Sequence, residues 1–149
     1  MKLDIRRVQT GKEMDQAFTI RRKVFIIGQN VPEDIEMDQF DESAQHVLAF
    51  VDGKSVGTAR WRFTEEGAIK LERFAVLDAY RSIGIGSALV RFILREIDND
   101  SPVYLNAQES VISFYEQFGF KSVGRIFFEA NIPHQKMILE DCLKDQPTI

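Results

Sequence analysis

Two glycines that stand one residue apart, Gly84 and Gly86, separate an apolar stretch from an amphipathic one. The first turn of a helix has backbone N–H groups without intrahelical partners, and the helix dipole adds about half a positive charge there. Glycine also lets a ligand approach the backbone closely. The stretch fits two interpretations: a cradle for a phosphate or pyrophosphate, to which Arg81 adds a side-chain charge, or a plain turn between a strand and a helix.

The elements that must position this loop follow from the hydrophobic pattern. Residues 71–77 are mostly apolar and contain Phe74 and Val76, which predicts a strand. From Gly84 on, apolar residues recur at the spacing of one helix face; they are Ile85, Ala88, Leu89, Phe92, Ile93 and Ile97. The predicted unit is therefore strand, glycine loop and helix.

Two familiar phosphate loops do not match this stretch. A nucleoside-triphosphate loop needs a lysine directly after its last glycine, and Gly86 is followed by Ser87. A dinucleotide loop needs a further glycine where this chain has Leu89. A third pattern fits: residues 81–86, Arg-Ser-Ile-Gly-Ile-Gly, resemble the Gln/Arg-x-x-Gly-x-Gly/Ala pyrophosphate loop of the GNAT family of N-acetyltransferases, which hold acetyl-coenzyme A.

The resemblance covers nearly the whole chain. Residues 103–107, followed by Phe114-Tyr115 and residues 118–120, resemble the later family motif, in which a strand ends in Asn-Ala and a helix carries Phe-Tyr before Gly-Phe. Finer matches resemble the small bacterial YjcF/ElaA-like branch; they are residues 22–38, His46, residues 71–73, residues 106–108 and residues 132–134. One position departs: the branch has Glu-Gln before Asn-x-Pro, and this chain has Gly28-Gln29. If that glutamate shapes the acceptor site, the acceptor here differs.

The resemblance implies both a fold and a reaction. The fold is a single α+β domain over residues 1–149, with a mixed, mostly antiparallel central sheet flanked by helices. The reaction is transfer of the acetyl group of acetyl-CoA (coenzyme A) to a primary amine by direct attack, which makes the protein an acyltransferase. A non-catalytic module of the same fold that binds or senses acyl-CoA is the first alternative. A nucleotide-binding enzyme is the second, and the missing lysine after Gly86 counts against it.

The resemblance also implies the residues of the site. Those that would hold coenzyme A are Phe74, Ala75, Val76, Arg81, Ser82, Ile83, Gly84, Ile85, Gly86, Ser87, Asn106 and Phe114. The backbone of residues 74–76 would pair with the pantetheine arm, and Asn106 would hydrogen-bond to the same arm. Those that would contact the acceptor are Gln29, Trp61, Arg73 and His134.

Glu72 is the candidate proton acceptor. A free lysine-type amine has a pKa of about 10.4, so neutralising it at pH 7 costs about 4–5 kcal/mol. The Glu72 carboxylate could take that proton directly or through ordered water. Its expected strand face also carries Lys70, Phe74 and Val76. The alternative interpretation is a cross-strand ion pair between Glu72 and Arg60 or Arg62, and the two interpretations are compatible.

Tyr115 is the candidate donor to the departing thiolate. Tyrosine is less acidic than a thiol, so full proton transfer is uphill by about 2 kcal/mol unless the site shifts one pKa. A hydrogen bond that steadies the thiolate would be enough. The alternative is a core aromatic at helical spacing, which also describes Phe114 and Phe118.

The other elements follow from periodicity and turn residues. The expected strands are residues 3–8, 45–51, 55–63, 103–106, 120–129 and 135–139, and the first helix is residues 11–27, begun by a Thr10/Glu13 capping box. Asp52-Gly53 predicts a two-residue hairpin turn. A later helix is expected to begin at a Ser110 cap and to end at Gly119. Residues 28–43 are acidic and predict a solvated loop with a short helical turn. The resemblance to the family implies instead that this region borders the acceptor pocket.

Composition limits the class of protein. The chain has 149 residues, 44% hydrophobic and 28% charged, which is typical of one globular domain. A net charge of −4 argues against a nucleic-acid partner and favours a cationic amine. No membrane span or signal peptide is expected, so a cytoplasmic protein is predicted. A homodimer is compatible with the sequence.

Cysteine and histidine do not form a metal set. Cys142 is the only cysteine, which leaves a thiol and no internal disulfide. His46 and His134 are the only histidines, and their spacing from Cys142 matches no metal-ligand motif. His134 is the better candidate for a functional histidine because it lies in a segment that resembles the branch.

Overall fold

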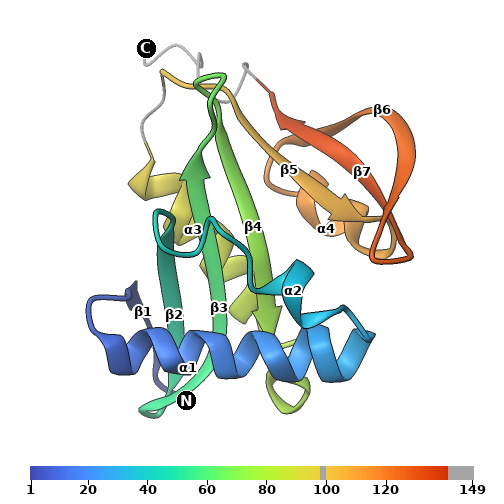
Figure 1. Ribbon diagram of the computed structural model, residues 1–149. Helices are drawn as coiled ribbons and strands as arrows, with labels where there is room; N and C mark the ends of the chain where they lie inside the picture. The colour runs from blue at the N-terminus through green and yellow to red at the C-terminus, as the bar shows by residue number, and fades with distance from the viewer. Residues whose placement is uncertain (98–99, 141–149) are drawn as a thin grey trace, which may run out of the picture. The chain divides into compact units, whose positions relative to one another are not determined.

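The computed structural model describes residues 1–97 and 100–140, which fall into two compact units (Figure 1). Unit 1 contains Met1–Arg62 and Glu72–Glu96, and unit 2 contains Phe63–Leu71 and the described residues from Ile97 on. The prediction of a single domain stays a prediction. Cys142 and residues 145–149 lie outside the described residues.

The strands of unit 1 form an antiparallel meander. β1 (Leu3–Arg7) pairs with β2 (Gln45–Val51), and β2 pairs with β3 (Lys54–Phe63). Asp52 and Gly53 have φ values of 48° and 83°, as the left-handed two-residue turn expected between β2 and β3 requires. The last residues of β4 (Ile69–Val76), from Glu72 on, also belong to unit 1.

The helices of unit 1 lie on both faces of these strands. α1 (Gly11–Arg21) continues as the π-helix η1 (Arg22–Ile27), so the predicted helix over residues 11–27 is confirmed in extent. The Thr10 cap is also confirmed, because Thr10 Oγ1 accepts the Glu13 N–H at 3.1 Å. The remaining helices are α2 (Glu33–Glu36), the 3₁₀-helix η2 (Asp78–Tyr80) and α3 (Ile85–Glu96). α1 and α3 cover opposite faces of β2 and β3 (Figure 1).

Close packing fixes α3 against β3. A Cβ on Gly57 would lie 3.2 Å from Ile85 Cγ2 and 3.3 Å from Leu89 Cδ1, so a larger residue would require these side chains to shift. The apolar face predicted for this helix is the buried one, since Ile85, Leu89 and Ile93 are at most 1% exposed. The first turn of α3, which follows the glycine loop, is therefore held by the core of unit 1.

Unit 2 contains the rest of the sheet. β5 (Val103–Gln108) runs parallel to the start of β4, and β7 (Ile132–Leu139) pairs antiparallel with both β5 and β6 (Phe120–Glu129). The 3₁₀-helix η3 (Glu109–Val111) and α4 (Ile112–Glu116) connect β5 to β6. The strand order β1-β2-β3-β4-β5-β7-β6 confirms the predicted α+β fold with a mixed, mostly antiparallel sheet.

Two boundary predictions in unit 2 are wrong. β7 begins at Ile132 rather than Gln135, because the turn is only Ala130 and Asn131, whose φ values are 50° and 63°. Ser110 does not cap α4, since it lies inside η3 and the N-cap residue, Val111, makes no side-chain bond. The first correction places His134 inside a strand.

In the described residues, no helix has the length and apolar character that would let it cross a membrane.

Candidate active site

The glycine loop has the predicted order of strand, loop and helix. After β4 and η2, Ser82 and Gly84 have φ values of 66° and 92°, and α3 begins at the next residue, Ile85. The Ala88 N–H donates to the Gly84 carbonyl at 3.0 Å, which closes the first turn. Residues 81–84 are exposed, and a Cβ on Gly84 would meet nothing within 4 Å. The loop thus leaves open space before a helix N-terminus.

Arg81 is turned back onto its own loop. Its Nε donates to the Val76 carbonyl at 3.0 Å, and its Nη1 lies 2.7 Å from Asp78 Oδ1. The Arg81 side chain is 50% exposed, so this pairing is weak. If a phosphate bound at the loop, Arg81 would exchange the exposed Asp78 carboxylate for the phosphate, which carries more negative charge.

Unit 1 also contains a cluster of paired charged side chains that are mostly buried. We name it the buried charge cluster; its members are Arg21, Arg60, Arg62, Arg73, Glu36, Asp38, Asp41 and Glu72. Arg60, which is fully buried, places Nη1 2.7 Å from both Asp38 Oδ1 and Asp41 Oδ1, and its Nε donates to Glu72 Oε2 at 2.7 Å. Four arginines thus balance four carboxylates.

The second buried arginine of the cluster comes from α1. Arg21 is 1% exposed, and its guanidinium pairs with Glu36 Oε2 at 2.8 Å and with Asp41 Oδ1 at 2.6 Å. Its Nη2 also donates to the Glu36 carbonyl. Asp41 therefore joins Arg21 to Arg60, so the cluster ties α1 and the acidic segment to β3.

The pKa values in the cluster reflect this pairing. Burial acts to raise the pKa of Asp38 and of Asp41, but the hydrogen bonds and charges of nearby arginines outweigh it and lower both. Burial acts to lower the pKa of Arg60, and its carboxylate partners raise it above its usual value. Burial raises the pKa of Glu36 despite Arg73 and Arg21. The two aspartates and Arg60 are held charged.

Glu72 is an ion-pair partner in this cluster. Its Oε2 accepts from Arg60 at 2.7 Å and from Arg62 Nε at 3.1 Å, and its Oε1 accepts from Arg62 Nη2 at 3.4 Å. The ion-pair interpretation is confirmed with both arginines. The role of Glu72 as a base stays a prediction.

The strict alternation expected along β4 is wrong around Glu72. Arg73 has a φ of 59°, and its Nη2 lies 3.0 Å from Asp38 Oδ2, so Glu72 and Arg73 both reach the buried charge cluster. A left-handed residue interrupts the two-residue period of a strand and costs about 1–2 kcal/mol. Arg73 Nε also lies 3.1 Å from Glu36 Oε2, which helps to hold this conformation.

The acidic segment at residues 28–43 is only partly solvated. Its predicted helical turn is confirmed as α2, and Glu33, Asp34 and Glu42 are exposed. The expectation of solvated carboxylates is wrong for Glu36, which is 3% exposed, and for Asp38 and Asp41. These carboxylates are buried because arginines from α1, β3 and β4 compensate their charge.

Unit 2 holds the candidate thiolate partner. Tyr115 lies in α4, is 8% exposed, and packs edge-to-face against Phe114 at 5.0 Å and Phe120 at 6.2 Å between ring centroids. Burial raises the pKa of the Tyr115 hydroxyl well above its ordinary value. The Tyr115 hydroxyl is thus a weaker acid than that of a tyrosine in water.

Asn106 and His134 lie on the same face of unit 2. Asn106 is opposite Lys136, and His134 is opposite Gln108, so these four residues alternate with the buried Leu105 and Met137. The His134 ring stacks on Phe127 with centroids 5.9 Å apart. His134 Nδ1 lies 2.7 Å from the Ile132 carbonyl oxygen.

The predicted site residues occur in both units. Unit 1 contains Glu72, the coenzyme A candidates from Phe74 to Ser87, and three acceptor candidates; these are the half-buried Gln29, the buried Trp61 and Arg73. Unit 2 contains Asn106, Phe114, Tyr115 and His134. The structure assembles Glu72 and Arg73 in one cluster. It places Asn106 and His134 on one sheet face.

Sequence reasoning did not find four members of the buried charge cluster: Arg21, Glu36, Asp38 and Asp41 were not expected to pair. One signal was present, because Arg21 follows Ala17 by four residues and so falls on the buried stripe of the helix. A charged residue on an apolar stripe indicates a buried partner.

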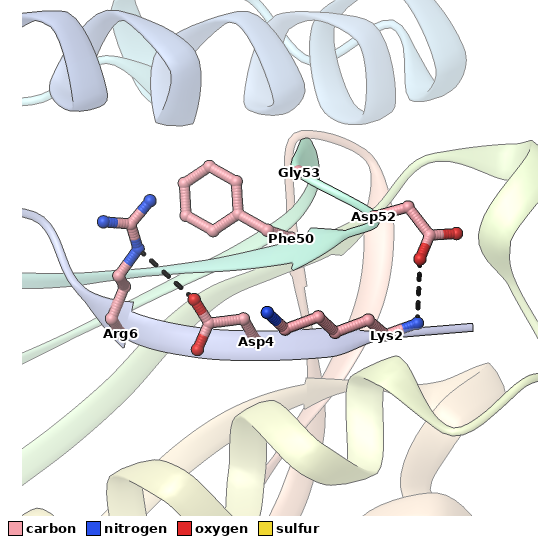
Figure 2. Close-up of a pocket in the computed structure, with 6 residues that line it drawn as sticks. All are labelled: Lys2, Asp4, Arg6, Phe50, Asp52 and Gly53. Atoms are coloured by element: carbon pink, nitrogen blue, oxygen red, sulfur yellow. Dashed lines mark hydrogen bonds and ion pairs between the residues drawn. The ribbon is translucent and has the colours of Figure 1, made fainter.

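One hollow in unit 1 lies apart from these residues. Its volume is about 260 Å³, and Figure 2 shows its lining by Lys2, Asp4, Arg6, Phe50, Asp52 and Gly53. The Lys2 backbone N–H donates to Asp52 Oδ1 at 2.9 Å, and the Arg6 guanidinium lies 4.3 Å from the centre of the Phe50 ring. No predicted site residue lines this hollow, so it adds nothing to the chemistry.

Comparison with known proteins gives consistent results. The model of the acetyltransferase (GNAT) domain family matches residues 11–141. The uncharacterized N-acetyltransferase YjcF of Bacillus subtilis is 33% identical over 130 residues, which are 85% of this chain and 92% of YjcF. An acyl-CoA N-acyltransferase structure from Pseudomonas aeruginosa has a TM-score of 0.84 at 29% identity, and Escherichia coli ElaA has 0.84 at 25%. Each of these two structural alignments covers 93% of this chain and all of the matched structure.

Proposed function

The chain belongs to the acetyltransferase (GNAT) domain family and is an acyltransferase, and we propose that it transfers the acetyl group of acetyl-CoA to a primary amine. The observation that carries this proposal is the exposed glycine loop, which precedes the N-terminus of a twelve-residue helix anchored in the core. The loop has the residue pattern of the family's pyrophosphate loop. We also propose that the reaction takes place in the cytoplasm.

The residues of the loop fit the pyrophosphate of coenzyme A. Open space surrounds the Cβ position of Gly84, and the unpaired N–H groups of the first turn of α3 favour an anion. Arg81 and Ser82 are exposed next to them and would add a positive charge and a hydroxyl. Bound coenzyme A would supply the acetyl thioester, and the chain would bind and orient it.

The proposed reaction proceeds without a covalent enzyme intermediate. The neutral amine attacks the thioester carbonyl carbon, a C–N bond forms, and the C–S bond breaks with release of the coenzyme A thiolate. Because burial raises the pKa of Tyr115, transfer of its proton to the thiolate becomes more uphill than in water. Tyr115 therefore acts as a hydrogen-bond donor that stabilises the thiolate and keeps its proton.

Tyr115→Phe should lower kcat at least about tenfold, or about 1.4 kcal/mol, and should leave the Kd for acetyl-CoA nearly unchanged. The ring keeps its packing against Phe114 and Phe120, so the midpoint of thermal unfolding should change little. Steady-state thiol release would measure kcat, and calorimetric titration would measure the Kd for acetyl-CoA. Wild-type turnover in Tyr115→Phe would remove this hydroxyl from the mechanism.

Calorimetric titration with acetyl-CoA tests the function, with ATP and NAD as controls. Selective binding of acetyl-CoA is expected, followed by amine-dependent thiol release with at least one of spermidine, kanamycin, L-lysine and a lysine-containing peptide. Binding without thiol release for every amine would favour the alternative, a non-catalytic module that senses acyl-CoA. Binding of none of the three nucleotides would contradict both.

A further inference from the structure

We propose that His134 is the base that accepts the proton of the acceptor ammonium, a role that rests on the proposed acyl transfer. The proton moves from the ammonium nitrogen to Nε2 of His134, and the neutral amine then attacks the thioester. The second amine proton leaves after attack, to the departing thiolate or to solvent. The net products are the amide, coenzyme A thiol and one proton, so the reaction needs no other reactant.

The tautomer of His134 is set by its own backbone. The Ile132 carbonyl oxygen only accepts, so Nδ1, at 2.7 Å, must carry the hydrogen. In the neutral ring the lone pair then lies on Nε2. Within residues 1–97 and 100–140, no hydrogen bond to Nε2 is found. Nε2 is therefore poised to accept a proton.

The ring is also rigidly placed. It stacks on Phe127 of β6 at an interplanar angle of 23°, is only 9% exposed, and sits on a strand that is paired on both sides. Its face of the sheet also carries Asn106, the residue proposed to hold the pantetheine arm. A base on paired strands keeps its geometry better than one on a loop.

Charged groups occur on several elements packed against β7. They are Lys136 of β7 itself, Glu109 of η3, and Lys121, Arg125 and Glu129 of β6, while β5 contributes Tyr104. Lys136 lies on the His134 face, but its Nζ is 4.7 Å from the centre of the Tyr104 ring. None of these groups forms an ion pair with the His134 ring in the part of the chain that the structure describes.

The other candidates are less suited to this role. The Glu72 oxygens accept from Arg60 and Arg62, so protonation would cost these charge-assisted hydrogen bonds. His46 is 6% exposed, and its Nε2 is bonded to the Asp41 carbonyl at 2.8 Å. Burial lowers the pKa of His46, which keeps it neutral. Glu72 and His46 are accordingly weaker candidates for the base than His134.

The test replaces each histidine by the amide that retains its observed hydrogen bond. His134→Asn keeps a donor near Nδ1 for the Ile132 carbonyl and removes Nε2, whereas His46→Gln keeps a donor near Nε2 for Asp41. With the fastest of the four amines named above, His134→Asn should lower kcat/KM about 100-fold, with the Kd for acetyl-CoA unchanged. His46→Gln should retain wild-type kcat/KM.

The pH profile separates a base from a structural residue. In the wild type, kcat/KM should show an acidic limb, because a protonated base cannot accept the ammonium proton, in addition to the slope that amine ionisation contributes. That additional limb should be absent from His134→Asn and from His134→Gln, measured with the same amine. If either variant keeps the wild-type limb and rate, His134 is not the base. Loss of the limb only in Glu72→Gln would assign the role to Glu72.

Failure of the proposed function has a different signature. If the wild type releases no thiol with any of the four amines, the transferase proposal and the role of His134 fall together. If the wild type is active and His134→Asn is equally active at every pH, only the role of His134 fails.

Discussion

Gly86→Arg should weaken acetyl-CoA binding roughly 100-fold or more, or by at least about 2.7 kcal/mol. Gly86 is the second residue of α3, directly at the N–H groups proposed to bind the pyrophosphate. An arginine side chain there would occupy the space that the phosphates need. The helix itself should persist, because arginine is a better helix former than glycine by about 0.5–1 kcal/mol. Calorimetry would measure the Kd, and thermal unfolding would verify the fold.

Gly11→Arg is the matched control for this variant. Gly11 is the first residue of α1, is exposed, and has nothing within 4 Å of its Cβ position. The control makes the same change of size and charge at another helix start, on the opposite face of the strands from α3. It should bind acetyl-CoA like the wild type. Normal affinity in Gly86→Arg would show that the loop does not hold the pyrophosphate.

Arg60→Met should destabilise the protein by about 3–5 kcal/mol. The substitution keeps an apolar chain of similar length but removes the guanidinium that contacts Asp38, Asp41 and Glu72. These carboxylates would remain partly or fully buried with reduced compensation. Urea unfolding at pH 7, followed by circular dichroism, would measure the change in the free energy of unfolding.

Arg6→Met is the control for the loss of an arginine as such. The Arg6 side chain is 54% exposed, and its ion pairs with Asp4 and Glu13 are 3.7 and 3.4 Å long. Exposed pairs contribute at most about 1 kcal/mol, so this variant should be close to the wild type. Equal stability of Arg60→Met and Arg6→Met would mean that the buried charge cluster adds no net stability through Arg60.

The acidic segment should also depend on Arg60 for its position. Arg60 donates to Asp38 and Asp41, and Arg73 donates to the Ile35 and Glu36 carbonyls of the same segment. Loss of Arg60 should therefore loosen residues 33–41 before it disturbs the sheet. This follows because no apolar side chain within residues 33–41 is buried, and the nearest buried ones, Val31 and Ala44, lie outside the segment.

The sequence alone determined the local elements of this protein. The Thr10 cap, the Asp52-Gly53 turn, the apolar face of α3 and the loop with Gly84 depend on neighbours close in the chain, and all appear as predicted. The resemblance to the family rests on short motifs such as residues 81–86 and 103–107, and the fold that it implied is confirmed. Local propensity and periodicity are sufficient for such features.

Only the tertiary structure decided how charges and protons are placed. Arg21, Arg60 and Glu36 lie far apart in the chain, and their burial is tolerable only because the fold brings opposite charges together. The left-handed Arg73, the burial that raises the pKa of Tyr115, and the bond that sets the tautomer of His134 arise in the same way. Desolvation and ion pairing depend on the whole surroundings of a group, which no local pattern of residues specifies.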